Sequence, residues 1–313
     1  MTRLFIIVSF LFYSCSDNNV NTYNTIIPKP VYQSVKEGFF NLSEKTEVIF
    51  DSAFENEASY VKSELLINYG KNKNVIQLIK NKSLKEEEYF LSISKNKILI
   101  EASTAKGQMH GIQSIRQLIP RKTKNNPTKI IIKCMEIHDY PKFKWRGLLL
   151  DCCRHFMEKD FVKKYIDLLA YHKMNVLHWH LTEDQGWRIE IDKYPKLTEI
   201  GAWRKDKNGD IYGGYYSKED IREIVEYAKT RHIEIIPEIE LPGHSVAAIA
   251  SYPSLSCTGK KINVETDWGV FKDIYCAGED SVFTFLEGVL SEVVELFPSK
   301  SVSYTHLTLP TKA

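Results

Sequence analysis

Residues 175–188 read NVLHWHLTEDQGWR, and this stretch decides the fold. Its first seven residues are mostly apolar, as in a buried strand, and residues 182–185 after them are polar and largely acidic. A strand that becomes polar at its carboxyl end is typical of a scaffold that presents a site there. His178 and His180 are two residues apart, so both side chains lie on the same side of the strand.

Strands and helices alternate around this stretch. Three buried strands and three amphipathic helices are predicted in turn, over residues 145–151, 161–172, 175–181, 217–228, 233–240 and 281–297. Ser217 precedes the second helix, and Asp220 three residues later completes a capping-box pattern. Because polar residues follow the strand ends, the pattern predicts an α/β fold, the (β/α)8 TIM barrel. Residues 141–300 supply about its first three units, so we expect an incomplete barrel.

Residues 26–140 are predicted to form a small α+β accessory domain before the barrel. Short β-like runs separated by turn residues are expected at residues 46–50, 75–79, 89–94, 97–101 and 129–137. Ser103 is the expected N-cap of a helix that extends to Leu118 and ends before Pro120. The sequence of this region contains no recognisable group of catalytic residues.

The first 25 residues have the pattern of a targeting segment and a tether. Residues 1–15 contain Arg3, an apolar run too short to span a bilayer, and Cys15. The stretch LFYSCSDNN resembles a bacterial lipoprotein signal, in which Cys15 becomes the lipidated N-terminus; an ordinary secretory signal is the alternative. Residues 16–25 are a polar tether. We therefore expect an exported bacterial lipoprotein, held at the outer membrane by Cys15 and facing the periplasm or the cell surface.

The composition and the net charge of the chain exclude few classes of function. The chain of 313 residues suffices for one large domain or two ordinary ones, and its composition is that of a globular protein. The formal net charge is +2, and charges of both signs are mixed along the chain. No nucleic-acid partner is indicated.

The cysteines indicate an exported protein without a zinc site. Cys257 and Cys276 flank a loop-like segment and could form a disulfide after export. Cys134, Cys152 and Cys153 lie in apolar runs and are predicted to be buried thiols. The chain has no CxxC spacing, so zinc is not indicated.

His178 and His180 have the spacing of the HxH motif of some metal-dependent hydrolases. No third or fourth ligand is evident in the sequence, and Trp179 between them indicates packing. We interpret both histidines as structural, with a metal-dependent amidohydrolase as the alternative.

Glu238 and Glu240 lie two residues apart on the third predicted strand, a separation of about 6.5–7 Å. That distance is within the range of carboxylate pairs in glycoside hydrolases, but two groups on one strand cannot flank a bond from opposite faces. We interpret them as residues that line a site or form ion pairs.

Arg154 and His244 follow the ends of the first and third predicted strands. A guanidinium at Arg154 can donate two parallel hydrogen bonds to vicinal sugar hydroxyls or to a carboxylate. A salt bridge with Asp151 or Glu183 is the structural alternative. His244 follows a Pro-Gly pair beside two acids, so a site role and a structural role are both open.

Several long motifs, in order, resemble the family 20 glycoside hydrolases, the β-N-acetylhexosaminidases. These motifs are WRGLLLDCCRHF, HKMNVLHWHLTEDQGWRIEI, YPKLTEIGAWR, YGGYYSKEDIREIVEYA and IIPEIELPGH. The runs IIPKP and EASTAKGQMHGIQSIRQLIP resemble the accessory domain of that family. The resemblance covers roughly residues 26–300.

The resemblance implies removal of terminal, non-reducing N-acetylhexosamine from glycans or chitin-type oligosaccharides, without cofactor or metal. In the family the 2-acetamido carbonyl of the sugar attacks its own anomeric carbon; a Glu acts as general acid and then base, and the Asp before it orients the acetamido group. Arg154 would bind hydroxyls of the terminal sugar. Glu183, where the family often has Asp, would form with His244 the network that tunes the acid–base Glu, and Glu240 would support the site.

The Asp-Glu pair of the family lies in a Gly-Gly-Asp-Glu motif on the fourth strand, expected directly after Lys300. No Gly-Asp-Glu occurs in the chain. Residues 301–313, SVSYTHLTLPTKA, resemble translated sequencing-adapter read-through, with a Thr-rich strand as the alternative, and are left out of the fold prediction. We expect an N-terminal fragment of an exported hydrolase that is itself inactive; a non-catalytic sugar-binding protein is the rival interpretation.

Overall fold

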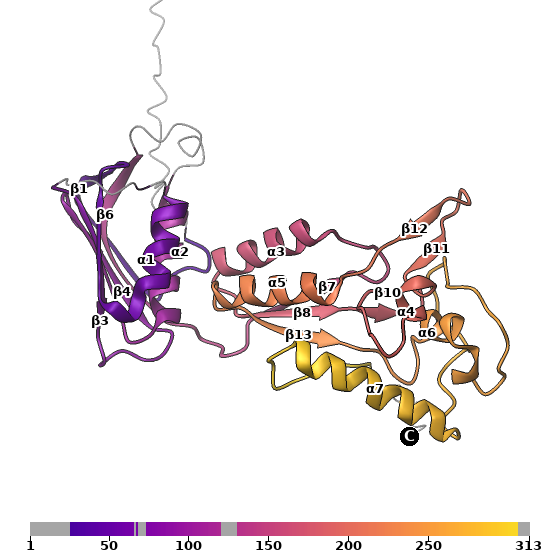
Figure 1. Ribbon diagram of the computed structural model, residues 1–313. Coiled ribbons are helices and arrows are strands. Elements are labelled where there is room, and N and C mark those ends of the chain that lie inside the picture. Colours follow the sequence, from indigo (N-terminus) through magenta and orange to yellow (C-terminus); the bar gives the residue numbers. More distant parts are fainter. Residues whose placement is uncertain (1–25, 66, 68–72, 120–129, 306–313) are drawn as a thin grey trace, which may run out of the picture.

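The computed structural model describes residues 26–305, except residues 66, 68–72 and 120–129. Cys15 and the targeting segment therefore lie outside the described residues. An α+β unit and an α/β unit follow each other along the chain, joined by an extended segment around residues 140–146 (Figure 1). None of the helices in the described part of the chain is both long and apolar enough to span a bilayer.

The first unit is a mixed six-stranded sheet with two helices on one face (Figure 1). The sheet order is β1-β6-β4-β5-β3-β2. Its elements are β1 (Tyr32–Leu42), β2 (Glu47–Phe50), the short 3-10 helix η1 (Ser52–Phe54), α1 (Glu55–Glu64), β3 (Val75–Lys80), β4 (Tyr89–Ile93), β5 (Lys97–Ala102), α2 (Ala105–Leu118) and β6 (Ile130–Asp139). Its core consists of the inward side chains of the sheet and the facing sides of α1 and α2.

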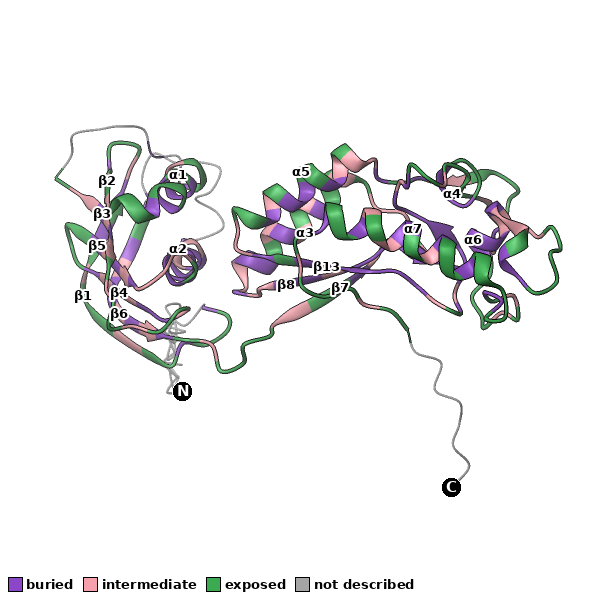
Figure 2. Cartoon of the chain, turned by 60° about the horizontal axis from the view of Figure 1, so that its bottom comes forward, coloured by how far each residue is buried: buried purple, intermediate pink, exposed green. Residues whose placement is uncertain are grey.

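The second unit is built on three parallel strands in the order β13-β8-β7. These strands are β7 (Gly147–Asp151), β8 (Val176–His180) and β13 (Glu234–Glu238). In the chain, β7 is followed by α3 (Lys159–Tyr171), β8 leads to α5 (Lys218–Lys229), and β13 leads to α7 (Asp280–Leu296). Each helix turns a buried stripe to the core and an exposed face to solvent, as the purple and green bands in Figure 2 show. Trp179 of β8 lies at the centre of this core, against Tyr216 and Phe297.

The connections that follow the carboxyl ends of β8 and β13 are long and lie at one end of the unit (Figure 1). After β8 come β9 (Thr182–Glu183), β10 (Gly186–Trp187), α4 (Lys196–Glu199), β11 (Trp203–Lys205) and β12 (Ile211–Gly213). After β13 come α6 (Val246–Ser251), the 3-10 helix η3 (Pro253–Leu255) and a loop closed by a disulfide between Cys257 and Cys276. The three remaining described cysteines are buried thiols, as predicted.

Residues near Ser303 lie parallel to β13. The amide of Ser303 donates to the carbonyl of Pro237 (2.8 Å), and the amide of Ile239 donates to the carbonyl of Ser303 (2.9 Å). This segment, which was left out of the fold prediction, thus occupies the position of a fourth parallel strand. Whether residues 301–313 derive from an adapter sequence stays a prediction.

Candidate active site

The register of the parallel sheet brings three ionisable residues to one edge. Asp151 pairs with His180, and His180 pairs with Glu238, so the last residues of β7, β8 and β13 stand side by side. Because carboxyl ends of parallel strands meet at the same edge, the residues that follow them also converge. Arg154, Glu183, Glu240 and His244, selected from the sequence, are among them.

Arg154 is held between two carboxylates. Its Nη1 lies 2.7 Å from Oδ2 of Asp151, and its Nη2 lies 3.1 Å from Oε2 of Glu183. Burial by itself raises the pKa of Asp151, but the hydrogen bonds from Arg154 outweigh burial and hold that pKa below its ordinary value. The salt bridges proposed as the structural alternative are both present, and they fix the orientation of the guanidinium.

Glu183 and His244 form a buried acid–imidazole pair. The side chain of Glu183 is 1% exposed, and its Oε1 lies 2.6 Å from Nδ1 of His244. Burial raises the pKa of Glu183 to about 7, against the opposing effect of the Asp184 amide and of the charges on His244 and Arg154. Burial lowers the pKa of His244, but the carboxylates of Glu183 and Asp184 outweigh it and the net shift is upward. The pair therefore retains a proton near neutral pH.

Glu238 and Glu240 line the interior beside the sheet edge. Oε2 of Glu238 lies 2.7 Å from Nε2 of His178. Burial, followed by the neighbouring Glu240, raises the pKa of Glu238 to about 8. Glu240 accepts a hydrogen bond from the hydroxyl of Thr305 (2.7 Å), next to the segment in the fourth-strand position. The two acids thus lie side by side near His180, with carboxylate oxygens within 4.8 Å of each other.

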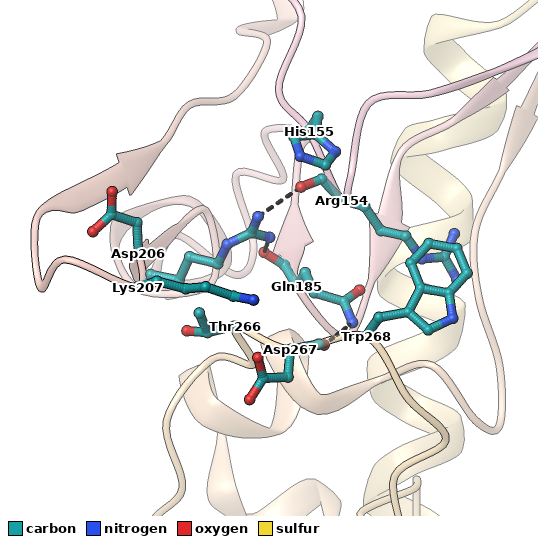
Figure 3. Close-up of a pocket in the computed structure, with 9 residues that line it drawn as sticks. Arg154, His155, Gln185, Asp206, Lys207, Thr266, Asp267 and Trp268 are labelled. Carbon is teal, nitrogen blue, oxygen red and sulfur yellow. Dashed lines mark hydrogen bonds between the residues drawn. The ribbon is translucent and has the colours of Figure 1, made fainter.

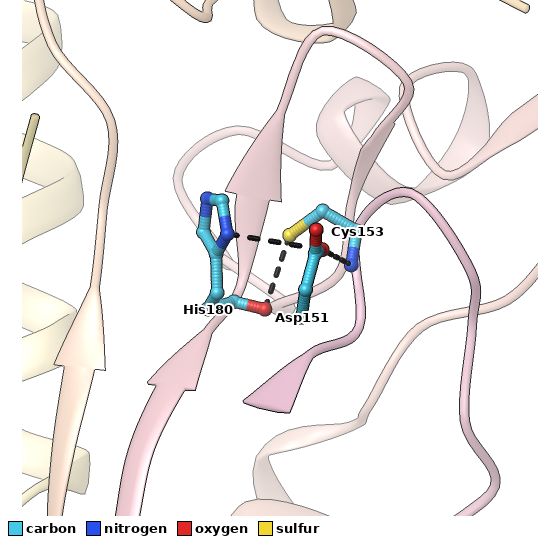
Figure 4. A group of neighbouring side chains, drawn as sticks. All are labelled: Asp151, Cys153 and His180. Atoms are coloured by element: carbon cyan, nitrogen blue, oxygen red, sulfur yellow. Dashed lines mark hydrogen bonds and ion pairs between the residues drawn. The ribbon is translucent and has the colours of Figure 1, made fainter. Parts of the chain in front are cut away.

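Two groups of side chains near His180 have the spacing of metal ligands. One is His180 with Glu238 and Glu240, and the other is Asp151, Cys153 and His180 (Figure 4). In the second group, burial raises the pKa of Cys153 well above its ordinary value, and the thiol donates to the carbonyl of His180 (3.1 Å). Nε2 of His180 lies 2.9 Å from the carbonyl of Thr182. These contacts favour the structural interpretation of His180.

Arg188 is a fully buried residue that sequence reasoning missed. Its guanidinium donates hydrogen bonds to backbone carbonyls of five residues, namely Cys152, Cys153, Gln185, Ala202 and Gly214. It therefore joins the loop that carries Arg154 to the β9–β10 turn and to the β11–β12 hairpin. The signal available in the sequence was its place directly after the Gly-Trp pair of the opening stretch.

A pocket of about 340 Å³ opens next to Arg154 (Figure 3). It lies between the loop after β7, the β11–β12 hairpin and the disulfide-closed loop. Its side chains include Gln185, Arg204, Lys207 and Trp268. None of these four was selected from the sequence as a site residue.

Comparisons with known proteins identify the family of the chain. The model of the catalytic domain of glycosyl hydrolase family 20 matches residues 143–307, and the model of domain 2 of that family matches residues 23–140. The chain belongs to glycosyl hydrolase family 20. The predicted fold is thereby confirmed: it is a TIM barrel, with about three of its units in this chain, preceded by an α+β domain.

Two of the relatives that the chain resembles are named β-hexosaminidase. A β-hexosaminidase of Porphyromonas gingivalis is 46% identical over 227 residues, which is 72% of this chain and 29% of the relative. A β-hexosaminidase of Vibrio furnissii is 36% identical over 297 residues, which is 88% of this chain and 47% of the relative. The chain thus spans less than half the length of these two proteins.

Solved structures of family 20 members superpose on most of the chain. An exo-β-N-acetylglucosaminidase of Vibrio harveyi in complex with N-acetylglucosamine matches with a TM-score of 0.82 and 32% identity, over 92% of this chain and 47% of that one. A β-N-acetylhexosaminidase of Streptomyces coelicolor A3(2) matches with a TM-score of 0.82 and 32% identity, over 89% and 58%. The domain boundaries and the roles of Arg154, Glu183, Glu240 and His244 stay predictions.

Proposed function

We propose that the whole protein is a β-N-acetylhexosaminidase that removes terminal, non-reducing N-acetylhexosamine from glycans or chitin-type oligosaccharides. Membership of family 20 supports the reaction class. The observation that carries the proposal is the fixed guanidinium of Arg154, held by Asp151 and Glu183 at the carboxyl end of the sheet. A planar donor group in that position suits two neighbouring sugar hydroxyls.

The proposed mechanism is substrate-assisted and retaining. The acetamido carbonyl oxygen of the sugar bonds to the anomeric carbon as the glycosidic bond breaks, and water then opens the oxazolinium ring with net retention. In this chain, Arg154 orients the sugar ring. The Glu183–His244 pair retains a proton next to Arg154, and its charge state tunes an acid–base carboxylate of the whole protein.

Sugar binding by the 313-residue chain tests the role of Arg154. Calorimetric titration with N-acetylglucosamine is expected to show binding that Arg154→Met weakens about 10- to 100-fold, since charge-assisted hydrogen bonds are lost. Arg222→Met is the matched control, because Arg222 is an exposed residue of α5 that pairs only with Glu219 among the described residues. Equal affinity of the wild type and Arg154→Met would contradict the proposed role.

Hydrolysis separates the enzyme from the rival sugar-binding protein. Because the sequence has no Gly-Asp-Glu, we expect no nitrophenol release from nitrophenyl-β-N-acetylglucosaminide by the 313-residue polypeptide. Sequencing of the locus past the codon for Lys300 should reveal a Gly-Gly-Asp-Glu motif in the reading frame, and the longer product should release nitrophenol. A verified stop after Ala313 would favour the sugar-binding protein.

We also propose that Cys15 carries a lipid that attaches an exported protein to the outer membrane. The lipoprotein-like stretch around Cys15 supports this proposal. Labelled palmitate should be incorporated into the wild type and into Cys134→Ala, but not into Cys15→Ala. Equal labelling of all three would refute the anchor.

A further inference from the structure

Arg188 is a buried guanidinium whose five N–H groups all have backbone acceptors. The residue is 0% exposed, and a guanidinium has five N–H groups and no acceptor of its own. The acceptors are the carbonyls of Cys152 (3.0 Å), Cys153 (2.5 Å), Gln185 (3.4 Å), Ala202 (2.6 Å) and Gly214 (3.0 Å). Because every N–H group is used and no face is exposed, Arg188 does not itself contact a ligand.

The charge of Arg188 is buried without a carboxylate partner. In the described part of the chain no ion pair includes this residue, and burial lowers its pKa. Taking a charge out of water costs free energy, and apolar residues of similar volume often stabilise a fold equally well or better in its place. Stability alone therefore does not account for an arginine at this position. What a guanidinium adds is a rigid, planar fork that fixes several peptide groups at once.

One of the peptide groups that Arg188 fixes leads directly into Arg154. The carbonyl of Cys153 and the amide of Arg154 belong to the same peptide bond. Arg188 donates to this carbonyl (2.5 Å), and the carboxylate of Asp151 accepts from the Arg154 amide (3.1 Å). Asp151 also accepts from the amide of Cys153 (2.9 Å; Figure 4). Since a peptide group is planar, holding it from both sides sets the direction in which the Arg154 side chain leaves the backbone.

Arg188 is also tied to the element that carries Glu183. Its Nη2 donates to the carbonyl of Gln185, in the β9–β10 turn just after Glu183, and its backbone amide donates to the carbonyl of Leu181 (2.8 Å) just before it. Oε2 of Glu183 in turn lies 3.1 Å from Nη2 of Arg154. Arg188 therefore sets the spacing between Arg154 and the carboxylate that orients the Arg154 guanidinium.

Gly186 is an independent indication that the chain makes room for this guanidinium. A Cβ atom at position 186 would lie 2.2 Å from Cζ of Arg188, which is closer than two such carbons can approach. The ring of Phe156 lies on the guanidinium as well, with Cζ of Arg188 5.8 Å from the ring centre, within the range of a cation–π contact. The turn after Glu183 thus closes on Arg188 in a way that only a glycine at position 186 allows.

We propose that Arg188 is a positioning residue for sugar binding. It holds the loop of Arg154 and the β9–β10 turn of Glu183 at the spacing that directs the Arg154 guanidinium to the terminal sugar, and it raises the affinity for that sugar without touching it. The inference rests on the proposed function, because it needs a terminal sugar at Arg154.

Arg188→Lys tests the inference, because lysine keeps the charge but has only three donors on a flexible stem. In calorimetric titration of the 313-residue chain with N-acetylglucosamine, this variant should bind about 3- to 10-fold more weakly than the wild type, since Arg154 loses part of its hydrogen bonding to the sugar. Arg188→Gln, a neutral side chain with two N–H donors, should lose at least as much. Circular dichroism should show that both variants are folded.

Arg146 provides the matched control. It lies just before β7, at the end of the strands opposite the candidate site, and its guanidinium donates to the carbonyls of Lys173 (2.7 Å) and Phe143 (2.8 Å) and pairs with Glu87. Arg146→Lys should lower the melting temperature, as Arg188→Lys does, but should change the affinity for the sugar less than about twofold.

Combination with Arg154→Met separates positioning of Arg154 from a general structural role. If Arg188 acts through Arg154, adding Arg188→Lys to Arg154→Met should change the affinity for N-acetylglucosamine less than about twofold, because the side chain that it positions is already gone.

Four results would overturn the inference. Equal affinity of the wild type and Arg188→Lys would show that Arg154 is positioned without Arg188, although the proposed function stands. If Arg146→Lys weakens binding as much, the loss follows from lower stability alone. If Arg188→Lys weakens binding to the same extent with and without Arg154, it does not act through that residue. If the wild type binds no N-acetylglucosamine, the inference and the proposed function fall together.

Discussion

The ionisation of Glu238 links the stability of the fold to pH. Its pKa of about 8 in the folded chain exceeds the unfolded value of about 4.3, so folding stabilises its protonated form. This stability is fully present below about pH 4 and is lost as the pH rises towards 8. Burial lowers the pKa of His178, so its imidazole is uncharged near neutral pH and does not oppose the upward shift of the pKa of Glu238.

Glu238→Gln should therefore abolish most of this pH dependence. Thermal melts of the variant and the wild type should nearly coincide at pH 4, and at pH 9 the variant should melt at least about 3 °C higher. Glu287→Gln, at an exposed acid of α7, should follow the wild type at both pH values. Parallel wild-type and Glu238→Gln curves would show that Glu238 is ionised throughout.

At the scale of residues, the side chains of the candidate site could be predicted from the sequence, but the residues that hold them in place could not. Arg154, Glu183 and His244 could be selected because each follows a predicted strand end, and the structure brings them into contact. Arg188 and Trp268 could not be selected in this way. Burial of Arg188 depends on carbonyls from four loop segments, and the position of Trp268 depends on hydrogen bonds across the pocket.

Helix α5 offers a test at the scale of elements, because its first turn holds the predicted capping box. The hydroxyl of Ser217 accepts from the amide of Asp220 (3.1 Å), and the Asp220 carboxylate accepts from the amide of Ser217 (3.2 Å). Ser217→Ala should lower the free energy of unfolding by about 1 kcal/mol. Denaturant titration measures this loss. Ser291→Ala, inside α7, is the control and should cost less, since alanine favours a helix interior; equal losses would argue against the cap.

Elements with strong periodicity were predicted to within about two residues, and elements without it were missed. The helix expected over residues 281–297 is α7 (Asp280–Leu296). Thr104, rather than Ser103, caps α2, and its hydroxyl accepts from the amide of Gly107. Strand β1 was not predicted, because it lies at an edge of the sheet and most of its side chains are exposed or half-buried. The β11–β12 hairpin was not predicted either, and tertiary hydrogen bonds from Arg188 to Ala202 and Gly214 hold its two ends.

At the scale of the whole molecule, the α+β unit and the barrel unit meet at an interface that local sequence patterns do not predict. Two loops that lead into β8 and β13 each present a residue with left-handed φ, Lys173 (58°) and His232 (58°). Nζ of Lys173 lies 2.9 Å from Oδ2 of Asp139, and Nε2 of His232 lies 2.8 Å from Oε1 of Glu57. The alternation of strands and helices predicted both units, but these contacts depend on how the units meet.

The Lys173–Asp139 pair should couple the unfolding of the two units. Its side chains are 7% and 12% exposed, and the ammonium also donates to the hydroxyl of Tyr89 (2.9 Å). Lys173→Met leaves a buried carboxylate unpaired, so we expect a loss of about 3–5 kcal/mol in the free energy of unfolding. Lys229→Met, at an exposed lysine of α5, is the control and should cost little.

Guanidinium titration followed by two signals resolves the coupling. All five tryptophans lie after residue 140, so their fluorescence reports on the barrel unit, whereas far-ultraviolet circular dichroism reports on both units. The two signals should coincide in the wild type. In Lys173→Met they should separate, because the buried pair that makes the two units unfold together is lost. Lys173→Met with Asp139→Asn should regain part of the loss, since no buried charge is then left unpaired. Coincident curves for Lys173→Met would mean that the remaining contacts, such as His232 with Glu57, suffice to couple the units.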